Sequence, residues 1–327
     1  MQPVPPPPPP HTSIIPETRQ LNTVKRPPPA VGESREGTQN IIGDYTWKDR
    51  GVERNHNFLL PKKSIRAIIV GKSGFGKSTL LNYLLLHPDM LDYDTLTVCG
   101  RSLHQPEYRI MRRAFAKGLS KSQVNELFKN QHELDEDDPE EFIDSYEGRC
   151  KGGIDATFSD SVDDIPDPSE HDPMRKNLLV FDDVMLGPQN KCESYYTRGR
   201  HNNVDVFYIA QSYFRLPRQT VRENANLFIF FKQDNTNLSH IYRDHCAVDG
   251  IPFEVFKNFC ADVWRGGRHN FVTLDTSRPA EAGKYRRNLN DYWVYDAPGP
   301  RTKPQPPRCL GTKNSESDHV SPNQHSS

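Results

Sequence analysis

Eight consecutive residues have the types and spacing of a phosphate-binding loop. The pattern GxxxxGK[ST] is fulfilled by Gly71, Lys72, Ser73, Gly74, Phe75, Gly76, Lys77 and Ser78. Glycines let the backbone wrap closely around phosphate oxygens, and the N–H groups of such a loop and of a following helix attract anions. The alternative is a chance glycine-rich loop, which the match at every fixed position makes the weaker interpretation.

The chemistry of this loop predicts ATP and Mg²⁺ as cofactors. Lys77 would reach the β- and γ-phosphates, and the hydroxyl oxygen of Ser78 would bind magnesium. The predicted nucleotide-binding residues therefore run from Gly71 to Thr79, with Lys77 also contributing to catalysis. The predicted activity is hydrolysis of ATP.

A second motif, NLLVFDD at residues 177–183, joins an apolar strand to two carboxylates. Asp182 would hold the magnesium ion, directly or through water. Asp183 would orient or deprotonate the attacking water, because one carboxylate serves the metal while the other stays free. The alternative is a pair of solvated acids at the end of a strand.

Polar residues that follow other strands extend this candidate site. Gln211 comes directly after the apolar run 204–210, so its amide is expected to sense the γ-phosphate or to position water; capping of the strand is the alternative. The nearby arginines are Arg198, Arg200, Arg215, Arg218 and Arg222. Arg200 first, and Arg222 second, are candidates to stabilise transition-state charge on a neighbouring subunit's γ-phosphate, and the others could grip DNA phosphates. A solvated surface role is the alternative for each.

The elements that must position these residues alternate between strand and helix. Strands are expected at 64–70, 94–99, 177–181, 204–210, 227–232 and 269–274. Helices are expected at 77–86, 106–117 and 189–200, with a short helix or turn at 217–226 and a helical stretch at about 237–260. This alternation predicts an α/β fold in which helices flank a central, mostly parallel sheet, as in P-loop NTPases.

Composition divides the chain into three parts. Residues 1–29 contain 11 prolines, so 1–44 is predicted to be a disordered proline-rich head, and 298–327 a disordered tail. The ATPase domain is predicted at 45–297. Within it, 131–172 is expected to be an acidic insertion or loop, because it has 16 Asp and Glu residues but 2 Lys and Arg.

The remainder of the chain is basic although the net charge is only −1. Outside 131–172, 40 Lys and Arg face 27 Asp and Glu, an excess of 13 positive charges. Such a body could bind a polyanion, or it could simply present ordinary basic faces. No long apolar run or secretory core is present, and the six cysteines lack CxxC spacing, which predicts a soluble intracellular protein with no membrane partner and no zinc site.

Over about residues 58–274 the order of these motifs resembles that of the DNA-packaging ATPases of the FtsK–HerA superfamily. The chain is especially similar to those of large double-stranded DNA viruses and of Polinton/Maverick elements. Three further pieces carry the resemblance, namely Ser102-Leu103-His104-Gln105-Pro106 in GRSLHQPEY, Gly199-Arg200-His201 before the strand that ends in Gln211, and Val221-Arg222-Glu223-Asn224-Ala225 before the next strand.

The resemblance implies a RecA/FtsK–HerA-like fold and an ATP-driven motor that pumps double-stranded DNA into a viral or virus-like capsid. It also implies a homo-oligomeric ring, a hexamer or pentamer, with capsid or portal-vertex proteins as partners. The expected location is then intracellular in the host, in the nucleus or a viral factory, or in the virion. Many members have Glu at the position of Asp183, so the shorter side chain leaves action through an intervening water open.

Two other classes share the P-loop. A nucleotide kinase would transfer phosphate to a small acceptor and would not need a strand ending in Gln followed by an arginine-rich segment. A nucleotide-binding regulator that does not act on DNA would lack a second acid such as Asp183. An ABC-type ATPase would carry an LSGGQ-like signature, and the sequence has none.

Overall fold

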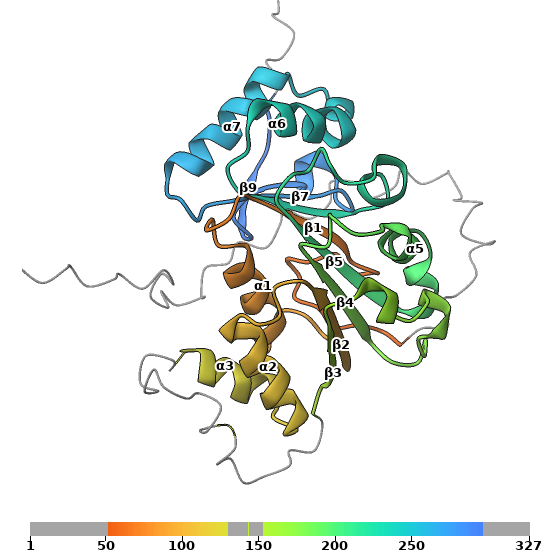
Figure 1. Cartoon of the computed structure of the whole chain (residues 1–327). Coiled ribbons are helices and arrows are strands. Elements are labelled where there is room, and N and C mark those ends of the chain that lie inside the picture. The colour runs from red at the N-terminus through yellow and green to blue at the C-terminus, as the bar shows by residue number, and fades with distance from the viewer. Residues whose placement is uncertain (1–51, 130–142, 144–152, 297–327) are drawn as a thin grey trace, which may run out of the picture. The chain divides into compact units, whose positions relative to one another are not determined.

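The computed structural model describes residues 52–129, 143 and 153–296 (Figure 1). The predicted proline-rich head at 1–44 and the predicted tail at 298–327 lie outside these residues, as does most of the first half of the acidic segment 131–172. Among the described residues, none of the helices has the length and apolarity needed to cross a membrane.

A nine-stranded sheet with the order β3-β2-β4-β5-β1-β6-β7-β8-β9 forms the centre of the fold. The strands are β1 (Arg66–Val70), β2 (Thr95–Gly100), β3 (Asp155–Ser159), β4 (Asn177–Asp182), β5 (Val204–Ala210), β6 (Leu227–Phe230), β7 (Val272–Asp275), β8 (Tyr285–Arg287) and β9 (Asp291–Trp293). Neighbouring strands pair in parallel along the part β3-β2-β4-β5-β1-β6 of the sheet. The pairs β6–β7, β7–β8 and β8–β9 are antiparallel. The predicted α/β class with a mostly parallel sheet is confirmed.

Helices cover both faces of this sheet (Figure 1). They are α1 (Lys77–Leu86), α2 (Pro106–Ala116), α3 (Lys121–Lys129), α5 (Asn190–Arg198), α6 (Asn235–Ile241) and α7 (Phe253–Arg265). The side chains of β1 alternate between the two cores: Ile69 packs with the core under α1 to α3, and Ile68 and Val70 pack with the core under α5 to α7. A strand buried on both faces explains the continuous apolar run that was visible in the sequence.

The main parallel strands and α1 match the elements expected from the sequence, whereas the sheet edges do not. The expectation of a loop throughout 131–172 is wrong at 155–159, because β3 pairs there with β2 as a parallel edge strand. Its residues are exposed or half-buried, so they lack the apolar run of a central strand. Helix α3 and the three-residue strands β8 and β9 were also not foreseen. The helical stretch expected at about 237–260 is interrupted near Gly250 and Pro252.

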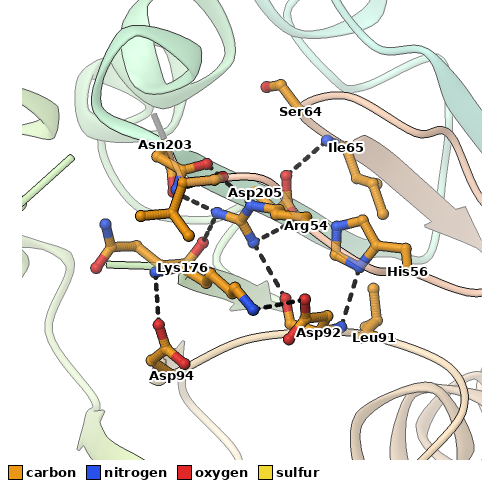
Figure 2. Close-up of polar contacts among 12 residues, drawn as sticks. Arg54, His56, Ser64, Ile65, Leu91, Asp92, Asp94, Lys176, Asn203 and Asp205 are labelled. Carbon is orange, nitrogen blue, oxygen red and sulfur yellow. Dashed lines mark hydrogen bonds and ion pairs between the residues drawn. The ribbon is translucent and has the colours of Figure 1, made fainter. Parts of the chain in front are cut away.

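A buried ionic network ties the segment before β1 to the amino ends of the parallel strands (Figure 2). Arg54 pairs with Asp205 at 2.7 Å and donates to the backbone carbonyls of Asn177 and Asn203. His56 contacts the same carboxylate at 2.9 Å, and the other carboxylate oxygen accepts from the Ile65 N–H. Asp205 is fully buried and contacts groups from three positions in the chain, although His56 Nε2 lies near it without hydrogen-bond geometry.

Asp205→Ala should therefore lower the free energy of unfolding by about 3–5 kcal/mol, because Arg54 would stay buried without its anion. Urea unfolding measures the change. The control is Asp155→Ala, which removes an exposed ion pair with Arg175 and should cost at most about 1 kcal/mol. Equal effects of the two substitutions would contradict the role of the buried network.

Candidate active site

The P-loop adopts a backbone that requires glycine at two positions. Gly74 and Gly76 have φ values of 73° and 98°, in the left-handed region that favours glycine. Gly76 also forms the N-cap of α1, so the loop leads directly into the helix start, where unpaired N–H groups gather. The strand–loop–helix context predicted from the sequence is therefore present.

Lys77 lies on the inside of this loop. Its Nζ donates to the backbone carbonyl of Lys72 at 3.1 Å, which folds the side chain back over the loop. Partial burial lowers the pKa of Lys77, while the negative charges of Asp182 and Asp183 oppose that shift. The ammonium group thus lies within the electrostatic reach of both predicted acids.

Asp182 is the last residue of β4, and it is buried, with 8% of its surface exposed. The hydroxyl of Tyr108, on α2, donates to its Oδ2 at 2.6 Å. Burial raises the pKa of Asp182, and Asp183 raises it further, whereas the Tyr108 hydrogen bond and Lys77 lower it. A cation placed beside this carboxylate would favour its ionised form, since an opposite charge stabilises the anion.

Asp183 occupies a backbone conformation that is unusual for a residue other than glycine. Its φ is 53°, and its N–H donates to the carbonyl of Ile209 at 3.1 Å. The side chain accepts from the Gln211 amide at 3.1 Å. Strained backbone of this kind persists where surrounding structure enforces it, and it is frequent at functional sites.

Strand β5 brings the two motifs and Gln211 together. The N–H of Gly71 donates to the carbonyl of Ala210, the last residue of β5, while Asp183 bonds the residue before it. Since β5 lies between β4 and β1, the P-loop and the acid pair are about 10 Å apart, twice the spacing of neighbouring strands. Gln211 follows β5 directly and lies between them.

The residues fit a nucleoside triphosphate with Mg²⁺. The glycine-permitted loop and helix start supply backbone donors for phosphate oxygens, and Lys77 supplies a cation. Ser78 is half-buried in the first turn of α1, and Thr79 is exposed beside it. Ser78 and Asp182 have the oxygen ligands that Mg²⁺ prefers, and the bound ion would neutralise charge on the phosphates. Asp183, with Gln211 bonded to it, would then be free to orient water. This arrangement is that of a P-loop nucleoside triphosphatase.

The two candidate arginines lie elsewhere. Arg200 is exposed in a short 3-10 turn before β5, at the amino end of the parallel strands. The seven residues of β5 separate that end from the P-loop edge by roughly 20 Å. Burial, and then the nearby charge of Arg200, lower the pKa of Arg66 at the start of β1. Arg200 thus does not reach the P-loop of its own chain.

Arg222 is 5% exposed and is paired within its own fold. Its Nη1 lies 3.1 Å from a carboxylate oxygen of Asp244, and its guanidinium lies 5.0 Å from the ring centre of Tyr213. Tyr213 donates to the same carboxylate at 3.0 Å. This placement argues against contact with a neighbour's phosphate, because a trans-acting arginine must be accessible. Arg222 instead holds the base of the loop that follows Gln211.

Sequence reasoning gave no role to two parts of the site. Tyr108 belongs to the quoted GRSLHQPEY motif, but its hydrogen bond to Asp182 spans 74 residues and only appears in the fold. The loop 266–270 between α7 and β7 packs against the P-loop. There His269 lies 3.2 Å from the Phe75 carbonyl, and Arg268 lies over the Phe75 ring. No spacing pattern in the sequence links these residues.

Comparisons with known proteins found remote similarity among solved structures. No family model matches the chain, and no curated protein matches it. The genome-packaging NTPase B204 of Sulfolobus turreted icosahedral virus 2, in complex with AMP, is 11% identical with a TM-score of 0.38, covering 66% of this chain and 93% of that one. The DNA-packaging ATPase B204 of Sulfolobus turreted icosahedral virus is 12% identical with a TM-score of 0.40, covering 64% and 92%.

VirB4 of Thermoanaerobacter pseudethanolicus is 12% identical with a TM-score of 0.39, covering 76% of this chain and 97% of that one. Similarity at this level carries no argument about function. The functional case therefore rests on the residues of the site itself.

The two acids should separate into metal binding and chemistry. Asp182→Asn should weaken Mg²⁺-dependent ATP binding. Asp183→Asn should leave that binding largely intact and slow hydrolysis by a factor of about 10²–10⁴, the usual contribution of a general base. Nucleotide affinity with and without Mg²⁺, and single-turnover hydrolysis, measure the two effects. Equal loss of Mg²⁺-dependent affinity in both variants would show that the division of roles is wrong.

Asp183→Gly is the matched control for misfolding. Glycine accepts a φ of 53° without strain, so this variant should be as stable as the parent or more stable by up to about 1 kcal/mol, while hydrolysis is lost. Urea unfolding then shows that the loss of turnover does not come from misfolding.

Proposed function

We propose that the chain is a Mg²⁺-dependent ATPase that translocates double-stranded DNA. ATPase activity is supported by one observation: the P-loop, the acid pair and Gln211 meet at the carboxyl end of β5. Backbone donors and Lys77 bind the phosphates, Ser78 and Asp182 bind the metal, and Asp183 activates water with help from Gln211.

A basic surface beside the site supports DNA as the partner. It consists of Phe214, Arg215, Arg218, His240 and Arg243, which we call the β5–α6 surface. Phe214 is 53% exposed, and its ring centre lies 4.6 Å from that of His240. Arg243 contacts the ring of His240 at 2.8 Å, and Arg215 and Arg218 are exposed close to Phe214 in sequence, with Arg218 Nε 3.3 Å from a carboxylate oxygen of Glu223. Burial and then neighbouring arginines lower the pKa of His240, as expected in a positive field.

This surface is joined to the ATP site by only two residues of chain. Gln211 contacts Asp183, and Phe214 follows after Ser212 and Tyr213. Both ends of the connection are fixed: Ser212 and the Phe214 N–H bond the Asn237 side chain, at 3.2 and 2.9 Å. A change at Gln211 on hydrolysis would therefore be passed to the β5–α6 surface. Phosphate contacts of this kind bind DNA without reading its sequence.

We further propose that the active species is a homo-oligomeric ring, a hexamer or pentamer, that pumps DNA into a viral or virus-like capsid. Capsid or portal-vertex proteins would be its partners, and it would act in the host nucleus, in a viral factory or in the virion. The resemblance of motif order to packaging ATPases, including those of Polinton/Maverick elements, supports this part. The accessible Arg200 at the far edge of the sheet suits a contact with the next subunit.

Long duplex DNA should bind the protein and stimulate its ATPase. Replacing Arg215, Arg218 and Arg243 together by alanine should weaken binding and lower the slope of log affinity against log salt by up to about 3, roughly one per lost phosphate contact. The control replaces Arg175, Lys257 and Arg265, which are also exposed and remove the same charge. Fluorescence anisotropy across a salt series measures both.

Turnover supplies the second half of this test. Lys77→Ala should abolish ATP hydrolysis with or without DNA, because the charge stabilisation of the phosphates is lost. An ATPase rate that DNA does not change, or a DNA affinity that does not fall with rising salt concentration, would contradict a translocase. The first outcome would favour a nucleotide kinase or a nucleotide-binding regulator.

Mixing inactive variants should test the role of Arg200. Arg200→Ala subunits keep a competent P-loop, and Lys77→Ala subunits keep Arg200, so rings that contain both should regain turnover if Arg200 acts across the interface. Each variant alone should be inactive. Arg198→Ala is the matched control, since its side chain is exposed and pairs with Asp167 on its own chain. If mixed rings form, as shown by native mass measurement, and stay inactive, Arg200 does not act in trans.

A further inference from the structure

The loop 266–270 covers one side of the P-loop with a side chain that the proposed hydrolysis does not use. The Arg268 Cζ lies 5.3 Å from the centre of the Phe75 ring, and Nη2 lies 2.9 Å from where a Cβ on Gly74 would be. His269 Nδ1 donates to the Phe75 carbonyl at 3.2 Å and lies 3.0 Å from where a Cβ on Gly76 would be. Glycines in the P-loop thus admit this loop at close range.

Sheet order gives the direction in which a bound nucleotide must run. Asp183 and Gln211, which serve the γ-phosphate, follow β4 and β5 on one side of β1. The loop 266–270 leads into β7, which lies on the other side of β1 next to β6. Since the γ-phosphate faces β4 and β5, the nucleoside at the opposite end of the molecule extends toward β6 and β7, where Arg268 lies.

The guanidinium of Arg268 is available for a ligand. Arg268 is exposed, and within the part of the chain that the structure describes no carboxylate pairs with it. Phe75 is half-buried and supports one face of the guanidinium, so the opposite face is left for a flat partner. Arginine stacks on aromatic faces, and nucleobases stack readily on guanidinium planes.

We propose that Arg268, backed by Phe75, holds the nucleoside end of the bound nucleotide by stacking on its purine base. This inference rests on the proposed nucleotide site and adds its base-binding residue. His269 fixes the loop to the Phe75 carbonyl, which sets the height of the guanidinium above the P-loop. The phosphates are bound by the loop and Lys77, and Arg268 contributes affinity only for ligands that carry a base.

Comparing ATP with inorganic tripolyphosphate tests this assignment directly, because both have three phosphates and only ATP has a base. Arg268→Ala should weaken Mg²⁺·ATP binding about 5- to 150-fold, the range that loss of one base stack gives, and should leave Mg²⁺·tripolyphosphate binding within about twofold. Arg268→Lys keeps the charge without the plane, so it should behave like Arg268→Ala. Isothermal titration calorimetry measures both affinities without relying on turnover.

Two controls make each outcome decisive. Arg265→Ala removes an exposed arginine at the end of α7, three residues away, and should change neither affinity. Phe75→Leu should weaken ATP more than tripolyphosphate, because Arg268 loses its support. If Arg268→Ala weakens the affinity for ATP and for tripolyphosphate equally, and Arg268→Lys restores both, Arg268 is a phosphate contact and the stacking proposal is wrong. An unchanged affinity for ATP in Arg268→Ala would also overturn the stacking proposal. Failure of the parent protein to bind either ligand would instead refute the proposed nucleotide site.

Discussion

The backbone hydrogen bonds at the carboxyl end of β5 are the constraint on which the site depends. Gly71 and Asp183 each donate to one of the last two carbonyls of β5, from opposite sides. Shifting either neighbouring strand by one residue would reverse its side chains between the two cores and also move the P-loop or the acids away from Gln211. The apolar residues that set the register of β1, β4 and β5 therefore also set the geometry of catalysis.

The opposite edge of the sheet carries a different kind of interaction. There Asp205 contacts Arg54, His56 and the Ile65 N–H in one buried network (Figure 2). At the carboxyl edge, the hydroxyl of Tyr108 donates to Asp182. The amino edge thus holds a buried ionic network, whereas at the carboxyl edge Asp183 is half-buried and Gln211 is exposed. The carboxylate of Asp182, beside the strained Asp183, suits a cation, since an opposite charge stabilises the anion.

The proposed coupling between the ATP site and the β5–α6 surface would follow the same strand. Gln211 touches the candidate base and is followed within three residues by the exposed Phe214, whose loop is held by Asn237 and by the Tyr213–Asp244–Arg222 cluster. Arg222 therefore matters for the stiffness of this connection rather than for phosphate chemistry. A stiff connection passes a small displacement at the nucleotide to the β5–α6 surface, which a loose loop would absorb.

The P-loop, the strands that lead into Asp182 and Gln211, and the mostly parallel character of the central sheet could be predicted from the sequence. These features are local, because a few neighbouring residues suffice to predict them. The signals are glycine spacing, continuous apolar runs and the residue that follows each run. The sequence did not determine edge strands such as β3, whose exposed side chains carry no apolar pattern. The fold was needed to show that Arg222 is buried, that Arg200 lies at the far edge of the sheet, that Tyr108 contacts Asp182 and that Arg268 packs on Phe75. Those outcomes depend on contacts between residues far apart in the chain, which no local pattern records.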